Sequence, residues 1–243
     1  MKSQLINNYK DFIETLVLLK KRPFLFSLTL IIDFVFVFLF LMITRIFIDS
    51  ITLHVARLRS QELFGMDLDI FYSINESLNL TLLYVLIIFA LFLVLQNFNW
   101  FISNKILKNK IKYINFIKQF SLISLIYFVL ISIIIYFTLR IAFHSYFENI
   151  FILQNISIFL IPLILILMLI NLCTLNFKTT YKKIHYYIIP LIIIILLTFL
   201  VNLFSNFLFY VGIKGNLHLF ITAILLFCLI SISRIYLIKI RKK

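Results

Sequence analysis

The chain has 243 residues, of which 63% are hydrophobic, and 23 Lys and Arg against 9 Asp and Glu give it a net charge of +14. A soluble domain holds about 45–50% apolar residues, so one globular core cannot hide this excess. Long apolar runs between short charged stretches instead predict an all-α polytopic membrane protein that crosses the bilayer about six times. The basic residues lie beside the apolar runs, which favours anionic lipid headgroups as partners and argues against nucleic acid.

Residues 1–22 predict a cytoplasmic amphipathic helix and not a signal peptide. Charged residues such as Lys10 and Glu14 interrupt the segment, and no small-residue cleavage site follows. Apolar residues recur at helical spacing, whereas the charges cluster on other faces. The apolar set is Leu5, Ile6, Tyr9, Phe12, Ile13, Leu16 and Val17. Such a helix lies on the membrane surface, and a short soluble helix packed on cytoplasmic loops is the alternative.

Pro23 opens the predicted transmembrane domain, residues 23–238, because proline suits a first helical turn. A polar outer segment, residues 49–77, follows the first span, and Ile51–Phe64 within it is a candidate surface helix. A tight turn at residues 212–216 joins the last two spans. In chain order the predicted spans are residues 24–48, 78–99, 119–143, 152–176, 186–211 and 217–237, each long enough for a hydrocarbon core of ~30 Å.

The distribution of lysine and arginine predicts the orientation. With the N-terminus inside, the outer side keeps 5 of the 23 basic residues, namely Arg45, Arg57, Arg59, Arg140 and Lys214. The positive-inside rule therefore places both termini, including the basic tail at residues 239–243, in the cytoplasm of a multi-pass cell-membrane protein.

The sequence carries no pattern typical of an enzyme. It has 3 glycines, too few for a phosphate-binding loop, and no His-Glu-x-x-His, Cys-x-x-Cys or Gly-x-Ser-x-Gly pattern. Cys173 and Cys228 fall within apolar runs and are interpreted as packing residues. We therefore expect no catalytic activity, no cofactor and no metal site.

Asp33, deep in the inner half of the first predicted span, is the sharpest polar signal. An ionised carboxylate there costs at least ~2.5–3.5 kcal/mol, so it should be protonated, paired or facing water. Arg234 of the sixth span is its expected partner, and Asn171 and Thr174 of the fourth span lie at a similar depth. The set is interpreted either as a relay or substrate contact, or as a buried pair that links helices.

A second polar stripe lies toward the outer side. Tyr136 and Arg140 share one face of the third span, and Asn202 and Asn206 share one face of the fifth. Together these residues could line an outward-facing vestibule, with anchoring at the membrane interface as the plainer alternative.

Three segments carry a resemblance to a group of proteins. The sequence at residues 21–34, which reads Lys-Arg-Pro-Phe-Leu-Phe and then Ile-Ile-Asp-Phe, resembles the start of uncharacterised archaeal six-span membrane proteins. Residues 96–100 and 119–122 are similar to their second and third spans, and the likeness covers about half the chain. Those proteins have no assigned activity, so the resemblance implies the architecture and no mechanism.

Two functions follow as hypotheses. The missing motifs, short loops and surface helix favour a non-catalytic subunit, scaffold or membrane organiser, with a possible protein partner in the membrane. The alternative is a permease or lipid-handling transporter that uses Asp33 and Arg234 in the inner half of the bundle.

Overall fold

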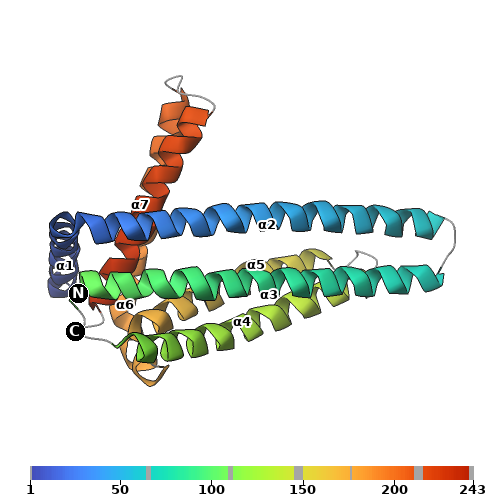
Figure 1. Ribbon diagram of the computed structural model, residues 1–243, viewed down its shortest axis with the longest axis horizontal. Coiled ribbons are helices and arrows are strands. Elements are labelled where there is room, and N and C mark those ends of the chain that lie inside the picture. The colour runs from blue at the N-terminus through green and yellow to red at the C-terminus, as the bar shows by residue number, and fades with distance from the viewer. Residues whose placement is uncertain are drawn as a thin grey trace. The chain divides into compact units, whose positions relative to one another are not determined.

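The computed structural model describes the backbone of residues 2–63, 67–108, 112–144, 150–175, 177–210 and 216–240. Side chains are described for residues 9–53, 75–108, 112–138, 140, 160, 161, 163–175, 187–206, 210 and 221–240. Over these backbone ranges the chain forms helices and no strand (Figure 1). The helices are α1 (Lys2–Lys21), α2 (Pro23–Leu63), α3 (Asp67–Ile106), α4 (Tyr113–His144), α5 (Ile150–Thr174), α6 (Phe177–Tyr210) and α7 (Asn216–Ile240).

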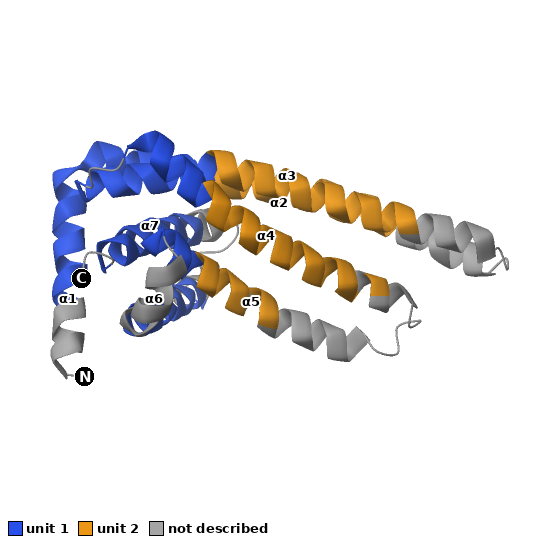
Figure 2. Ribbon diagram, turned by 90° about the horizontal axis from the view of Figure 1, so that it is seen from below, with its two compact units in different colours: residues 1–35, 95–120, 169–243 blue, residues 36–94, 121–168 orange. Residues whose placement is uncertain are grey.

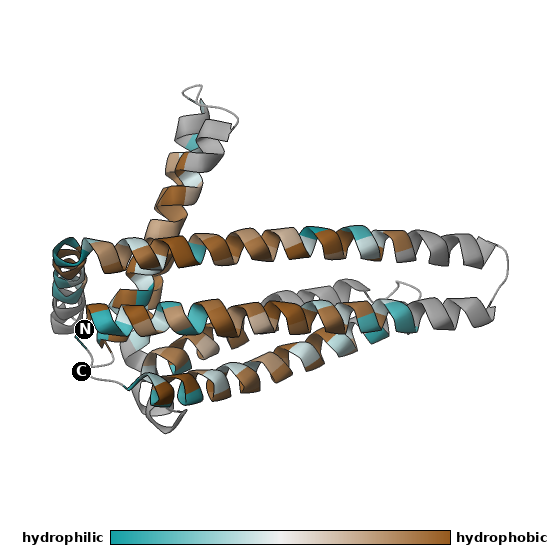
Figure 3. Cartoon of the chain, in the orientation of Figure 1, coloured by the Kyte–Doolittle hydropathy of each residue, from teal (hydrophilic) through white to brown (hydrophobic). Residues whose placement is uncertain are grey.

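Among the described residues, five helices are long and apolar enough to cross a membrane. Their apolar stretches in the described part of the chain are Pro23–Leu53, Asn75–Ile106, Tyr113–Thr138, Tyr187–Asn206 and Ile221–Ile240. Figure 3 shows this apolar character along the long helices. The protein is therefore an all-α polytopic membrane protein, and the predicted fold class is confirmed. The predicted span at residues 152–176 corresponds to α5, whose described side chains form the shorter apolar stretch Leu163–Thr174.

Helix α2 extends well into the segment that the sequence predicts as a polar outer loop. It ends at Leu63, and α3 begins at Asp67, so the helix predicted at residues 51–64 is the continuation of α2, and helix covers most of the outer segment at residues 49–77. The Ser50 and Thr52 hydroxyls donate hydrogen bonds to the carbonyls one turn earlier, at 2.9 and 2.7 Å. Because these hydroxyls bond to carbonyls of their own helix, the polar residues do not interrupt it. The rest of that loop at residues 64–66, most of the predicted turn at residues 212–216 and the end of the basic tail lie outside the described residues.

The chain divides into two compact units (Figure 2). Unit 1 comprises residues 1–35, 95–120 and 169–243, and unit 2 comprises residues 36–94 and 121–168. In unit 1, α6 packs against α7, and α1 packs against α7 and touches α6. The fully buried side chains include large aromatic residues of α4, α6 and α7: Phe116, Phe120, Tyr187 and Tyr236.

Unit 2 is held by aromatic pairs between long helices. Phe47 of α2 stacks on Tyr84 of α3 with ring centroids 4.2 Å apart, and Phe89 of α3 stacks on Phe128 of α4 at 4.0 Å. The Thr44 hydroxyl lies 2.9 Å from the Tyr84 hydroxyl. The sequence has no Gly-x-x-x-Gly pattern, which would let helix backbones approach closely, so contacts through bulky side chains are expected.

The amphipathic helix α1 turns its two faces to different surroundings. Phe12 packs edge-on against Tyr236 of α7 at 5.4 Å, and Asp11 and Thr15 are buried on the same side. An apolar stripe remains exposed, formed by Tyr9, Ile13, Leu16 and Val17. Phe12 thus belongs to the protein-facing side, because its ring contacts α7, although the sequence groups it with the membrane-facing stripe.

Candidate functional site

A buried ion pair between α2 and α7 forms the centre of unit 1. The Arg234 guanidinium donates from Nη2 to Oδ2 of Asp33. Asp33 is 3% exposed and Arg234 4%, so neither charge reaches solvent. A lone buried charge is costly, and each of these two groups compensates the other.

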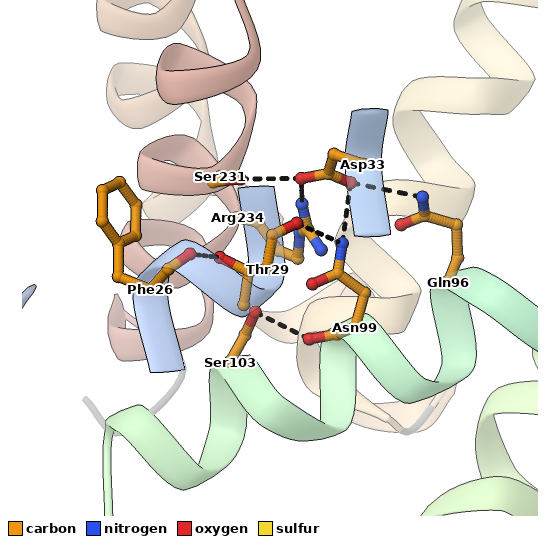
Figure 4. A network of polar contacts seen from close by, with 8 residues as sticks. All are labelled: Phe26, Thr29, Asp33, Gln96, Asn99, Ser103, Ser231 and Arg234. Carbon is orange, nitrogen blue, oxygen red and sulfur yellow. Dashed lines mark hydrogen bonds and ion pairs between the residues drawn. The ribbon is translucent and has the colours of Figure 1, made fainter. Parts of the chain in front are cut away.

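Three further donors complete the shell of the carboxylate (Figure 4). The Ser231 hydroxyl donates to Oδ2 at 2.7 Å, and the Asn99 amide donates to Oδ1 at 2.7 Å. The Gln96 amide reaches Oδ1 at 3.3 Å. The Asp33 carboxylate therefore accepts four hydrogen bonds, two at each oxygen.

Helical spacing places each pair of donors on one face. Gln96 and Asn99 are three residues apart on α3, and Ser231 and Arg234 are three apart on α7. Residues at this spacing are neighbours on a helix surface, so each helix presents two donors on the face that meets Asp33. The carboxylate of α2 thereby joins three helices.

The polar side chains next to the ion pair donate hydrogen bonds to backbone carbonyls. The Asn99 amide also donates to the carbonyl of Thr29 at 3.3 Å. The Thr29 hydroxyl donates to the Phe26 carbonyl at 2.7 Å, and the Ser103 hydroxyl donates to the Asn99 carbonyl at 2.9 Å. Such bonds satisfy the small polar side chains without drawing on the acceptors of Asp33.

Two buried polar atoms of the network form no hydrogen bond within the described part of the chain. Oδ1 of Asn99, an acceptor, and Nη1 of Arg234, a donor, make no hydrogen bond to any residue that the structure describes.

The other two predicted residues of the inner site lie at the C-terminal end of α5. Asn171 and Thr174 are 2% and 4% exposed. The Thr174 hydroxyl donates to the Asn171 carbonyl at 3.1 Å, and the Leu175 amide donates to the same carbonyl at 2.7 Å. Leu175 has a φ of 54°, the left-handed conformation that often ends a helix. These bonds give Asn171 and Thr174 a role in ending α5.

The predicted outer stripe is divided between the units. In unit 2, Nη1 of Arg140 donates to the Tyr136 hydroxyl at 3.4 Å along one face of α4. In unit 1, Asn202 and Asn206 are exposed on α6, and Asn202 lines a hollow of about 360 Å³ between α6 and α7. His144 ends α4, but its side chain lies outside the described residues.

A second polar cluster fastens α1 to the end of α7. Nζ of Lys239 lies 2.7 Å from Oε2 of Glu14 and donates to the Asp11 carbonyl at 3.1 Å. Nη1 of Arg22, which follows α1, donates to the Lys105 carbonyl at 2.6 Å, near the C-terminal end of α3. A cation at a helix C-terminus satisfies a carbonyl that the helix itself leaves open.

Sequence reasoning missed the two amides of α3. Gln96 and Asn99 appear in it only as marks of a family resemblance, although two amides three residues apart near the inner end of a span are a readable signal. What the sequence lacks is the information that α3 is the neighbour of α2 at this depth.

No group of three or more His, Cys, Asp or Glu that could hold a metal ion occurs among the described residues. The chain matches no protein-family model, no curated protein and no solved structure.

Proposed function

We propose that this protein is a non-catalytic membrane subunit or scaffold, in which the network around Asp33 is a structural clamp between transmembrane helices. The observation that carries the proposal is the filled shell of the carboxylate, which accepts from Gln96, Asn99, Ser231 and Arg234. A carboxylate offers about four lone-pair positions, and all of them are used. A proton relay or substrate contact would need one of these positions open.

The proposed setting is the cell membrane, with six spans and both termini in the cytoplasm. The exposed apolar stripe of α1 supports a place in the inner leaflet interface, because lysines flank it: Lys10, Lys20 and Lys21 are all exposed. A helix with this arrangement binds anionic headgroups through the lysines while its apolar side chains enter the acyl boundary.

A permease or lipid-handling transporter is the second candidate. Asn99 Oδ1 and Arg234 Nη1 favour it, because a buried acceptor and a buried donor without partners among the described residues could serve a polar substrate. The same two atoms are also compatible with a clamp that closes imperfectly.

Native mass spectrometry of the full chain, extracted gently from its own membrane, tests the proposal. A stoichiometric complex with a protein, either a second species or a further copy of this chain, is the expected result. A single chain that carries one defined small molecule or lipid would overturn the subunit reading and support the permease. In that case the Arg234→Gln variant should lose the bound molecule.

A further inference from the structure

Two cations and a tyrosine from three segments of unit 1 meet at the C-terminal end of α3. Arg22 lies between α1 and α2, and its Nη1 atom lies 2.6 Å from the Lys105 carbonyl oxygen. Nζ of Lys105 lies 5.0 Å from the ring centroid of Phe101, one turn earlier in α3. The ring of Tyr113, the first residue of α4, lies 4.6 Å from the same Phe101 ring. We call Arg22, Lys105 and Tyr113 the basic corner.

The basic corner lies where three apolar stretches begin or end. The stretch of α2 begins at Pro23, that of α3 ends at Ile106, and that of α4 begins at Tyr113. Helix α3 ends here because Lys108 adopts the left-handed conformation, with a φ of 56°, and its amide bonds the Lys105 carbonyl at 3.0 Å. Tyrosine is enriched where membrane spans meet water. The corner is therefore at the level of the lipid headgroups.

The acids of unit 1 are paired with other cations. Of the 9 Asp and Glu residues in the sequence, unit 1 contains Asp11, Glu14 and Asp33. Asp33 pairs with Arg234, and Nζ of Lys239 lies 2.7 Å from Oε2 of Glu14 and 3.9 Å from Oδ1 of Asp11. Among the described side chains, none of these acids pairs with the basic corner.

The remaining acids of the chain lie too far along their helices to compensate the corner. The nearest along α2 is Asp49, and the nearest along α3 is Glu76. Each is separated from the corner by about 40 Å of continuous helix at ~1.5 Å per residue. Glu148 follows α4, whose opposite end carries Tyr113. Helix length alone thus leaves the positive charge of the corner without a counter-charge in the chain.

The chemistry of the corner matches a phosphate group. A guanidinium carries five N–H donors in a planar fork, and the bond to the Lys105 carbonyl holds Arg22 in place while it uses one of them. The Lys105 ammonium adds a point charge, and both types of side chain bind phosphate oxygens. At the ends of membrane spans this phosphate belongs to lipid headgroups, and basic pockets between such helices bind anionic ones.

We infer that the basic corner binds the phosphate of one anionic phospholipid in the inner leaflet. The choice of leaflet rests on the proposed orientation of the chain, whereas the choice of headgroup rests on the charge of the corner. Arg22 and Lys105 are 83 residues apart in sequence and are joined by a hydrogen bond. The folded bundle therefore forms this site, which differs from the row of lysines on the surface of α1.

Native mass spectrometry of the full-length protein with added lipid tests the site. The parent should bind its first phosphatidylglycerol more tightly than phosphatidylcholine, which has no net charge. Lys105→Gln should weaken that first step about fivefold, because a basic residue near an anionic surface contributes ~1 kcal/mol. Lys118→Gln is the matched control and should bind like the parent, because it removes the same charge from an exposed position of α4 outside the corner.

Arg22→Gln provides a second variant at a different segment and should also weaken the first step about fivefold. Equal losses in Lys105→Gln and Lys118→Gln, or a parent without preference for phosphatidylglycerol, would overturn the inference. Inorganic phosphate identifies the source of the ligand. If phosphate at the same concentration displaces phosphatidylglycerol from the parent, the corner binds a soluble anion and the lipid assignment is wrong.

This outcome is separable from that of the proposed function. A complex with a partner protein but no preference for phosphatidylglycerol would overturn the lipid site and leave the subunit role standing. A chain that stays single but shows the preference and its loss in Lys105→Gln would support the lipid site and overturn the subunit role.

Discussion

The side chain of Asp33 shows how one charge can be accommodated inside a membrane protein. Its two oxygens receive donors from α3 and α7, so the carboxylate is both neutralised by Arg234 and hydrogen-bonded on all sides. Breaking a buried pair from one side is more harmful than removing both charges, because the remaining charge is left without compensation.

This asymmetry gives a prediction for Asp33. The Asp33→Asn variant should lose about 3–5 kcal/mol of stability, since Arg234 then stays charged at 4% exposure. The double variant Asp33→Leu with Arg234→Met should recover most of that loss. Thermal unfolding in detergent, followed by size-exclusion chromatography, measures both. A fully stable Asp33→Asn variant would contradict the clamp.

The donors of α3 should differ in importance. Asn99 bonds Asp33 at 2.7 Å and also reaches the Thr29 carbonyl, whereas Gln96 bonds Asp33 at 3.3 Å. We expect Asn99→Ala to cost about 1–3 kcal/mol, because it removes two hydrogen bonds to buried acceptors, Oδ1 of Asp33 and the Thr29 carbonyl. Gln96→Ala should cost less than about 1 kcal/mol. The same unfolding assay compares the stability losses of the two variants. A larger loss for Gln96→Ala would show that the shorter hydrogen bond of Asn99 is not the more stabilising one.

At the scale of a single element, α1 has one face for the protein and another for the membrane. Phe12 contacts Tyr236, while Tyr9, three residues away, is 66% exposed. Substitutions within one turn of α1 can therefore separate its packing against α7 from its contact with the membrane.

The two faces predict different phenotypes. Phe12→Ala should loosen α1 from α7 and speed amide hydrogen exchange along α1, because a packed aromatic pair is lost. Tyr9→Ala should leave exchange in detergent unchanged and weaken binding to anionic vesicles. Exchange measured by mass spectrometry and vesicle flotation separate these results. If Tyr9→Ala speeds exchange in detergent, the exposed stripe serves packing.

The long helices show what a sequence can and cannot predict for such a protein. The apolar runs predict helices, and the depths of Asp33 and Arg234 point to their pairing, because charge in lipid needs a partner. The roles of Gln96 and Asn99 are not predictable in this way, since spans that are apolar all round do not identify their neighbours. The sequence predicts a separate surface helix at residues 51–64, whereas α2 continues without a break to Leu63. Hydropathy falls at this point, but Ser50 and Thr52 bond back to their own helix.

At the scale of the whole molecule, the basic residues predict the orientation in the membrane. Lys105 lies in the last turn of α3, and Lys118 lies near the start of α4. Lys108 and Lys112 lie between the two helices, and the positive-inside rule predicts that all four face the cytoplasm. The N-terminal part of α3 then begins on the outer side.

Labelling of intact cells checks this orientation. In the chain that carries Cys173→Ala and Cys228→Ala, Glu76→Cys should react with a membrane-impermeant thiol reagent added outside. Lys112→Cys should react only after the cells are permeabilised. Both positions are exposed, so accessibility across the membrane decides the result. Reaction of Lys112→Cys in intact cells would reverse the proposed topology.

The residues that bond Asp33 are synthesised at different times. Its α3 donors lie 63 and 66 residues downstream, but Arg234 lies 201 residues downstream. At ~5–20 residues per second, a nascent chain waits about 10–40 s between the synthesis of Asp33 and that of its counter-charge. During that interval the amides of α3 are its first partners, and a chain truncated before α7 keeps an uncompensated carboxylate in its first hairpin. Helix α7 therefore supplies the charge that compensates Asp33.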